Sequence, residues 1–189
     1  EMPETGPAKG RQMKGKLITF EGSEGCGKST QSRLLFQYLK SKGCDVLYLR
    51  EPGSTKVSEK IRKVLLDAKN DSMSAETEML LYMAARAQIV HEIIKPALCA
   101  GKIVICDRFL DSTLAYQGYG LGMDIKTIKA VGRFATQGIA PDLTILLDLA
   151  LHKGYKYHAA KKDRIEQRSS GYHDRVRRGY LRLASLEPR

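Results

Sequence analysis

Residues 22–29 have the types and spacing of a loop that binds the phosphates of a nucleotide. They read GSEGCGKS, which fits the pattern GxxxxGK[ST]. In such a loop the backbone N–H groups and the N-terminus of the following helix surround phosphate oxygens. The lysine reaches the β- and γ-phosphates, and the hydroxyl is a ligand for Mg²⁺. The motif therefore predicts a site for a nucleoside triphosphate, with Mg²⁺ as cofactor.

We expect one run of residues to hold these phosphates: Gly22, Ser23, Glu24, Gly25, Cys26, Gly27, Lys28, Ser29 and Thr30. Lys28 is the expected catalytic cation, and Ser29 is an expected ligand of the metal. Cys26 is expected to fill the turn as a small side chain rather than to react. Because motors, GTPases and kinases all use such a loop, a second site has to decide the class of protein.

Asp107 and Arg108 form the first candidate for that second site. They follow the apolar run IVIC, where a strand would end. Ligands bind at the carboxyl ends of strands in open α/β sheets. There Asp107 could bind Mg²⁺ or its waters, and Arg108 would present a planar fork to a phosphate. The competing interpretation is an ordinary ion pair at the surface.

Tyr82 and Arg86 form the second candidate, one turn apart on an expected helix. The expected core stripe of that helix is Leu80, Met83, Ala84, Ala87 and Ile94. Tyr82 and Arg86 then lie together, away from the stripe. An aromatic face beside a guanidinium suits a nucleobase. The competing interpretation is a tyrosine packed under a neighbouring helix and a solvated arginine.

Short apolar runs alternate with helical patterns along the chain. Strands are expected at 16–21, 45–50, 102–107 and 143–149, and helices at 28–41, 57–67, 75–99, 112–118, 125–137 and 172–185. Strands buried on both faces read as continuous Val/Ile/Leu runs, so this alternation predicts a parallel sheet covered by helices. The expected fold class is a three-layer α/β domain of the P-loop NTPase type, from 16 to 189.

Two segments are expected to lie outside this core. Residues 1–15 are rich in proline, glycine and charge, which predicts a disordered tail. Residues from about 150 to 170 are polar and basic without apolar periodicity, which predicts a short lid.

Composition limits the classes of function. The 189 residues are 42% hydrophobic and 28% charged, as in a globular domain, with a net charge of +11. No apolar run approaches the roughly 20 residues that span a bilayer, and no secretory signal is present, so we expect a cytoplasmic protein without a membrane partner. Positive charge favours anionic partners, but no aromatic residues interleave with the basic runs, so we expect no nucleic acid partner.

Several motifs taken together make a resemblance specific. FEGSEGCGKSTQ, REPGST at 50–55, EKIR at 59–62, YMAAR at 82–86, DRFLDSTLAYQG at 107–118 and PDLTILLDL at 141–149 stand in the order and spacing of bacterial thymidylate kinases. From about residue 16 to 185 the chain resembles this family of P-loop nucleoside monophosphate kinases. The resemblance implies that ATP donates its γ-phosphoryl group to dTMP, giving dTDP and ADP, with Mg²⁺. It also implies a homodimer packed through helices beside the acceptor site.

The resemblance assigns roles to the residues that match. Arg62 and Arg108 resemble the arginines that hold the acceptor phosphate, and Arg86 resembles the arginine that binds the base. Tyr82 stands at the position that stacks on the base, where phenylalanine is usual. Asp107 and Arg108 are the residues expected to act in catalysis beside the lysine of the phosphate loop.

Five further residues match positions around the acceptor nucleoside. Ser112 and Thr113 resemble the polar groups near the thymine edge. Tyr116 and Gln117 resemble the wall on the sugar side that disfavours a 2′-hydroxyl. Glu24, inside the phosphate loop, matches the acidic residue near the acceptor sugar and the metal.

Three features depart from the family pattern. The motif EPGG reads EPGS here, so Ser54 is strained by roughly 1–2 kcal/mol if the position needs a positive φ. The phosphate loop has no arginine, and the lid offers Lys153, Lys156, Lys161, Lys162 and Arg164. We expect a lid lysine or Arg164 to approach the phosphates as a catalytic cation. Finally, the chain stops at LASLEPR, so the family's C-terminal strand and helix are expected to be absent.

Three other functions stay open at this point. A deoxynucleoside kinase of the same fold would need a general base instead of two arginines on an acceptor phosphate. A catalytically weak regulatory protein would bind both nucleotides without releasing ADP. A nucleic-acid-binding protein would show salt-sensitive DNA binding that survives Lys28→Ala.

Overall fold

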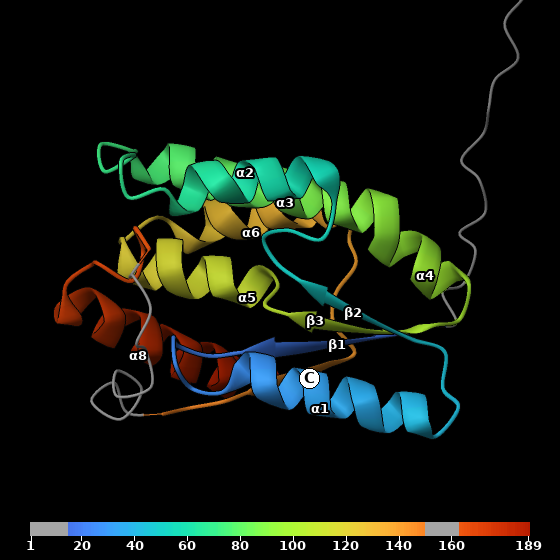
Figure 1. Ribbon diagram of the computed structural model, residues 1–189. Coiled ribbons are helices and arrows are strands. Elements are labelled where there is room, and N and C mark those ends of the chain that lie inside the picture. The colour runs from blue at the N-terminus through green and yellow to red at the C-terminus, as the bar shows by residue number, and fades with distance from the viewer. Residues whose placement is uncertain (1–14, 150–162) are drawn as a thin grey trace, which may run out of the picture.

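A parallel sheet runs through the middle of the protein (Figure 1). The computed structural model describes residues 15–149 and 163–189. Its sheet consists of β1 (Lys16–Glu21), β2 (Val46–Arg50), β3 (Ile103–Asp107) and β4 (Leu143–Leu146), in the order β2-β3-β1-β4. Helices lie on both sides of the sheet, which confirms the expected three-layer α/β fold. The expected tail, apart from Gly15, and the lid residues 150–162 lie outside the described residues.

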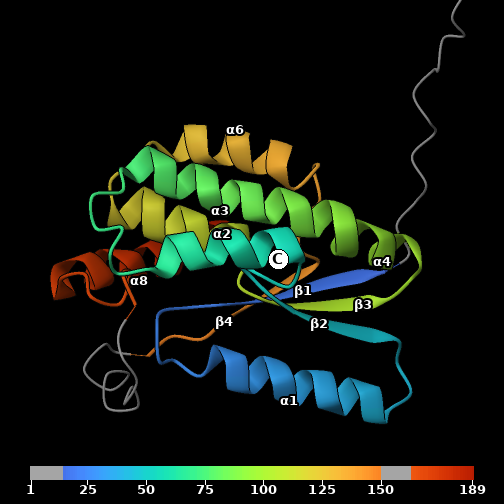
Figure 2. The ribbon, with the colours of Figure 1, turned by 45° about the horizontal axis from the view of Figure 1, so that its top comes forward.

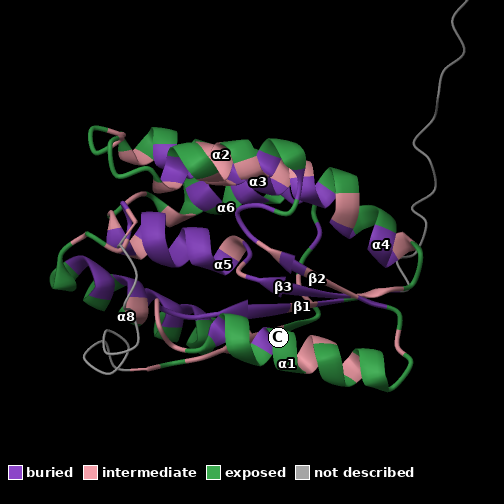
Figure 3. Ribbon diagram, in the orientation of Figure 1, coloured by how far each residue is buried: buried purple, intermediate pink, exposed green. Residues whose placement is uncertain are grey.

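Alternation of apolar side chains along the strands builds a core on each face of the sheet. Leu17 of β1 and Val104 of β3 pack with α3 (Ala75–Ile89) and α4 (Lys95–Cys99). Phe20 and Ile105, on the other face, pack against α1 (Lys28–Ser41). Figure 3 shows the strands buried between these helices. Double-sided burial is the reason why these strands read as continuous apolar runs.

The long helix expected at 75–99 is present, with an irregular turn in its middle. A π-helical segment, η1 (Val90–Ile94), joins α3 to α4. Pro96 lies in the first turn of α4. Proline has no N–H to donate and its ring crowds the carbonyl four residues earlier, so a wider turn before it is expected.

The remaining helical segments begin either with or without a side-chain cap. They are α2 (Lys56–Leu66), α5 (Leu110–Thr113), the π-helical η2 (Leu114–Gly120), α6 (Ile125–Ala135) and α8 (Ser170–Leu186). The side chains of Thr55, Ser74, Asp124 and Ser169 each accept a backbone N–H in the first turn of α2, α3, α6 and α8. Such caps are local signals. The element expected at 112–118 is longer, because α5 and η2 run on from one another.

The expected core stripe of α3 is wrong at two positions. Leu80 is 54% exposed and Ala84 is also exposed, whereas Met83 and Ile94 are buried as expected. The buried face includes Met79 instead, because α3 packs against α2, α6 and η2. Figure 2 shows α2, α3 and α6 side by side. Periodicity identifies an apolar face but not which neighbour covers it.

None of the helices in the described part of the chain combines the length and the apolar character needed to cross a membrane.

Candidate active site

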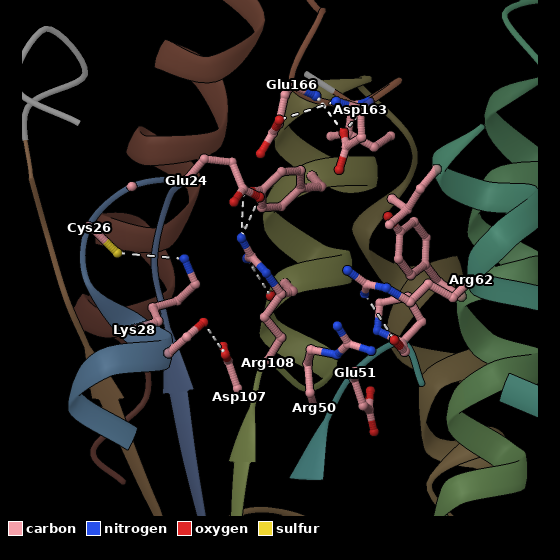
Figure 4. Close-up of a pocket in the computed structure, with 18 of the residues that line it drawn as sticks. Glu24, Cys26, Lys28, Arg50, Glu51, Arg62, Asp107, Arg108, Asp163 and Glu166 are labelled. Carbon is pink, nitrogen blue, oxygen red and sulfur yellow. Dashed lines mark hydrogen bonds and ion pairs between the residues drawn. The ribbon is translucent and has the colours of Figure 1, made fainter. Parts of the chain in front are cut away.

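The carboxyl ends of three strands meet at one edge of the sheet. Arg50, at the end of β2, is in register with Asp107, at the end of β3, and Phe20 of β1 pairs with Asp107 from the other side. A cavity of about 610 Å³ opens at this edge, with a lining from the phosphate loop, β2, α2, α3, η2 and residues 163–166. In Figure 4 Lys28 lies on one side of this cavity and Arg62 on the other, with Arg108 between them.

The phosphate loop lines the cavity with residues 24–30. Helix α1 begins at Lys28, and Gly27 before it has φ 91°, which favours glycine. Gly22 and Ser23 lie behind this lining. Gly22 sits against the chain after β4, where a β-carbon would collide with the Leu147 carbonyl. The loop thus has the strand-loop-helix setting that the motif requires.

Lys28 is folded onto its own loop. Its Nζ donates to the Ser23 carbonyl at 2.6 Å and lies 3.6 Å from Cys26 Sγ. Burial, followed by the nearby Arg108 guanidinium, lowers the pKa of Lys28. An anion in the cavity would offset both effects, since it would stabilise the charged ammonium.

Ser29 and Asp107 come together across the sheet edge. The Ser29 hydroxyl donates to Asp107 Oδ2 at 2.5 Å, and the Tyr48 hydroxyl donates to the same oxygen at 3.4 Å. Mg²⁺ prefers hard oxygen ligands and usually keeps several waters beside one or two protein groups. A serine hydroxyl next to a carboxylate therefore fits this metal.

Arg108 connects both halves of the site. Its guanidinium donates to Glu24 Oε1 (2.5 Å), Tyr180 Oη (2.9 Å), Tyr116 Oη (3.1 Å), the Gly22 carbonyl (3.1 Å) and Ser112 Oγ (3.2 Å). Burial by itself lowers the pKa of Arg108, but Glu24 and the tyrosine hydroxyls raise it well above its ordinary value. Arg108 is therefore a permanent cation at the centre of the cavity.

Arg62 and Arg50 lie on the opposite wall. Arg62 Nη1 donates to the Pro52 carbonyl at 3.0 Å, and Arg50 Nη2 lies 3.1 Å from Glu59 Oε1. Sequence reasoning selected Arg62 but missed Arg50. The signal was available, because Arg50 ends a strand at the same edge as Asp107. Ser54, in the same loop, has φ 68°, so the condition under which the sequence predicted strain at this position is met.

Arg86 does not line the cavity. It is only 2% exposed, and its guanidinium donates to Glu51 Oε2 (2.7 Å), Thr113 Oγ1 (2.9 Å) and the Phe109 carbonyl (2.9 Å). The interpretation of Arg86 as a solvated arginine is therefore wrong, and its expected contact with the base stays a prediction. A buried guanidinium needs several acceptors, and these neighbours supply them.

The other residues expected around the acceptor nucleoside line the cavity: Tyr82, Ser112, Thr113, Tyr116 and Gln117. Three of them also have partners behind the wall, and one is Ser112, whose Oγ donates to Glu21 Oε2 at 2.6 Å. Thr113 accepts from Arg86, and Gln117 Nε2 donates to Glu78 Oε1 at 2.8 Å. These contacts fix the side of the cavity away from the phosphate loop.

Arg164 is not among the residues that line the cavity, contrary to its expected place beside the phosphates. Its Nε donates to the Leu65 carbonyl at 2.8 Å, and Nη2 pairs with the buried Glu78 at 2.6 Å. Asp163 and Glu166, which sequence reasoning did not select, line the cavity instead. The sequence feature that could have indicated them is their position, since they are two acidic residues at the end of a basic segment. The lysines proposed for the lid lie outside the described residues.

A phosphate loop that faces several arginines across one cavity defines a P-loop kinase with a small phosphorylated acceptor. The chain belongs to the thymidylate kinase family, whose model matches residues 20–189. This confirms the resemblance noted in the sequence.

Individual relatives agree with the family assignment. Thymidylate kinase of Thermoanaerobacter sp. (strain X514) is 49% identical over 178 residues, which are 94% of this chain and 87% of the relative. That of Geotalea uraniireducens is 50% identical over 182 residues, with 92% and 85% coverage. The crystal structure of thymidylate kinase from Ehrlichia chaffeensis has a TM-score of 0.75 at 37% identity and covers 92% of this chain and 89% of its own.

Proposed function

We propose that this protein transfers the γ-phosphoryl group of ATP to dTMP, giving dTDP and ADP. The observation that carries the proposal is the position of Arg108, which lies between the phosphate loop and the wall of Arg62 and Arg50 in one cavity. Two polyanions that meet end to end need cationic groups at their junction, and this arrangement supplies them. Membership of the thymidylate kinase family supports dTMP as the acceptor.

Catalysis then depends on positioning and electrostatics. The loop amides and Lys28 would hold the donor phosphates, and Arg62 and Arg108 would hold the acceptor phosphate. Ser29 and Asp107 would hold Mg²⁺, which neutralises charge on the donor phosphates when it is bound. Their paired oxygens support this assignment.

The wall around the acceptor nucleoside is rich in aromatic residues. Tyr82 would stack on the base, and Tyr116 and Gln117 would bound the sugar. Arg86 lies behind this wall and donates a hydrogen bond to Thr113. We propose that Arg86 in this way holds Thr113 in position at the edge of the base. The expected direct contact of Arg86 with the base stays a prediction.

A panel of acceptors tests the proposed function. ADP release is measured with ATP and Mg²⁺ and with dTMP, dUMP, dCMP, dGMP or thymidine as acceptor. We expect the highest kcat/KM with dTMP. Activity with thymidine but not dTMP would indicate a deoxynucleoside kinase. Binding of ATP and dTMP without ADP release would indicate a regulatory protein and contradict the proposal.

We also propose that the protein acts in the cytoplasm as a homodimer. Val57 and Val64 on α2, Leu80 on α3 and Phe134 on α6 are large apolar side chains left exposed, Phe134 by 84%. These helices lie side by side (Figure 2), so a second copy could cover their apolar residues together. Light scattering tests this: Phe134→Glu is expected to shift the mass towards the monomer, and an unchanged dimer would contradict the interface.

A further inference from the structure

Glu21 is a buried carboxylate directly behind the proposed acceptor site. It is the last residue of β1, is 1% exposed and does not line the cavity. Three groups donate to it: Phe109 N to Oε1 at 2.8 Å, and Ser112 Oγ and Tyr180 Oη to Oε2 at 2.6 and 3.2 Å. Burying a carboxylate is costly even when it is well bonded, so this contact calls for an explanation.

The first effect of Glu21 is on the backbone at Arg108. Arg108 has φ 73°, a left-handed conformation that costs a residue with a β-carbon about 1–2 kcal/mol. Two consecutive amides hold it there, since Arg108 N donates to the Phe20 carbonyl at 3.0 Å and Phe109 N donates to Glu21. The end of β1 therefore determines the direction in which the Arg108 side chain leaves the turn.

The second effect of Glu21 is on the Arg108 side chain, and it depends on Tyr180 of α8. Arg108 Nη1 donates to the Tyr180 hydroxyl at 2.9 Å, and this hydroxyl donates to Glu21 Oε2. Ser112 Oγ lies 2.7 Å from the same hydroxyl and is also bonded to Glu21. Tyr180 is buried, so its ring is held by packing. Arg108 Nη1 also donates to Ser112 Oγ at 3.2 Å, so Glu21 holds the guanidinium through two intervening hydroxyls, those of Tyr180 and Ser112.

We propose that Glu21 and Tyr180 are positioning residues for phosphoryl transfer, which hold Arg108 in place before the acceptor phosphate arrives. This inference rests on the proposed role of Arg108 at that phosphate. A cation already held in place needs no reorganisation when charge develops during transfer. Neither residue lines the cavity, so both act through the residues that they contact there, Arg108 and Ser112.

The test compares Glu21→Gln and Tyr180→Phe with the wild-type protein in steady-state assays with ATP and dTMP. Each variant keeps the shape of the side chain. Tyr180→Phe removes the hydroxyl that contacts Arg108, Ser112 and Glu21, and Glu21→Gln replaces one accepting carboxylate oxygen with an amide NH₂ that only donates. We expect each to lower kcat/KM for dTMP by about tenfold, as for a lost hydrogen bond to a charged group, with KM for ATP changed by less than about twofold. In the double variant the loss is expected to be smaller than the product of the single losses, because both changes break one chain of contacts.

Tyr172→Phe is the matched control. Tyr172 is on the same helix and equally buried, but its hydroxyl bonds to Arg168 and to the Tyr116 carbonyl rather than to Arg108. We expect this variant to keep kcat/KM for dTMP within about threefold of wild type. An equal loss in Tyr172→Phe would show that any buried hydroxyl on α8 matters, and would overturn the proposal.

Other outcomes are equally decisive. If Glu21→Gln and Tyr180→Phe both keep kcat/KM for dTMP within about threefold, the positioning role is wrong. If Glu21→Gln fails to fold, Tyr180→Phe alone decides. Arg108→Ala separates the positioning role of Glu21 and Tyr180 from the acceptor role of Arg108. If Arg108→Ala abolishes turnover while Glu21→Gln and Tyr180→Phe keep the wild-type activity, only the positioning role is wrong. If Arg108→Ala itself keeps the wild-type kcat/KM for dTMP, the acceptor role of Arg108 is wrong.

Discussion

Arg108 Nη2 lies 2.5 Å from Glu24 Oε1, which joins the turn after β3 to the phosphate loop after β1. The two residues are 84 positions apart in the chain. Their contact brings the proposed donor site and acceptor site into one cavity. It also gives Arg108 a carboxylate partner that an incoming phosphate would replace or share.

Arg108→Ala is expected to lower kcat/KM for dTMP by at least about 10³-fold, because arginines at the transferred phosphate contribute about 10³–10⁵ in rate. Arg108→Lys keeps the charge and loses the planar fork, so we expect it to recover only part of the activity. Steady-state ADP release measures both. A kcat/KM for Arg108→Ala within about threefold of wild type would contradict the acceptor assignment.

Ser29→Ala is expected to raise the Mg²⁺ concentration needed for half-maximal rate by about tenfold or more, since it removes a hard oxygen beside Asp107. Ser29→Thr keeps the hydroxyl and is the control, with Mg²⁺ dependence close to wild type. The measurement is the rate as a function of Mg²⁺ at saturating ATP and dTMP. Identical Mg²⁺ curves for Ser29→Ala and wild type would exclude Ser29 as a ligand.

Glu21 gives stability a specific dependence on pH. Burial, followed by the nearby Asp111 carboxylate, raises the pKa of Glu21 from 4.5 to about 7. The folded protein therefore keeps a proton that the unfolded chain has already released. Between about pH 4.5 and about pH 7 this group makes the free energy of unfolding fall as pH rises, by up to about 1.4 kcal/mol per pH unit.

Glu21→Gln carries no such proton, so its free energy of unfolding should fall less steeply than that of wild type across this window. Urea unfolding at several pH values measures both slopes. Titrating groups that do not interact with Glu21 affect both proteins alike and cancel in the comparison, whereas the titration of Asp111 changes together with that of Glu21 because the two carboxylates repel each other. Parallel curves from about pH 4.5 to about pH 7 would mean that Glu21 titrates near its ordinary pKa in the folded protein.

Ser54 tests the cost of a left-handed residue in the loop after β2. Its φ is 68°, its N donates to Glu59 Oε1 at 2.8 Å and its Oγ donates to the Arg50 carbonyl at 3.1 Å. Ser54→Ala and Ser54→Gly both lose the hydroxyl, but only glycine tolerates this φ freely. We expect Ser54→Gly to be more stable than Ser54→Ala by about 1 kcal/mol in urea unfolding. Equal stabilities would show that the position carries no strain.

Arg164→Ala distinguishes a structural role from a role beside the phosphates. Arg164 pairs with Glu78 in the interior, so its loss should lower the free energy of unfolding by about 2 kcal/mol or more, even though Arg168 also binds Glu78. The control is Arg177→Ala, which breaks a partly exposed pair with Asp148 and should cost less than about 1 kcal/mol. Unchanged stability with a large loss of kcat would restore the catalytic role expected from the sequence.

The sequence by itself determined the local features of this protein. The phosphate loop, the caps at Thr55 and Ser74 and the apolar strands are specified by neighbouring residues, so their spacing can be read directly. Arg108 could be selected too, because the end of a strand in a parallel sheet predicts its place at the ligand edge.

Tertiary structure decided what depends on contacts between distant segments. In the folded protein Arg164 pairs with Glu78. Arg86 is buried and donates to Glu51, Thr113 and the Phe109 carbonyl. Tertiary structure also joined Glu21 to Tyr180, 159 positions later. The physical reason is that a buried charge goes wherever the fold provides its partners, and those partners come from segments that are far apart in the chain.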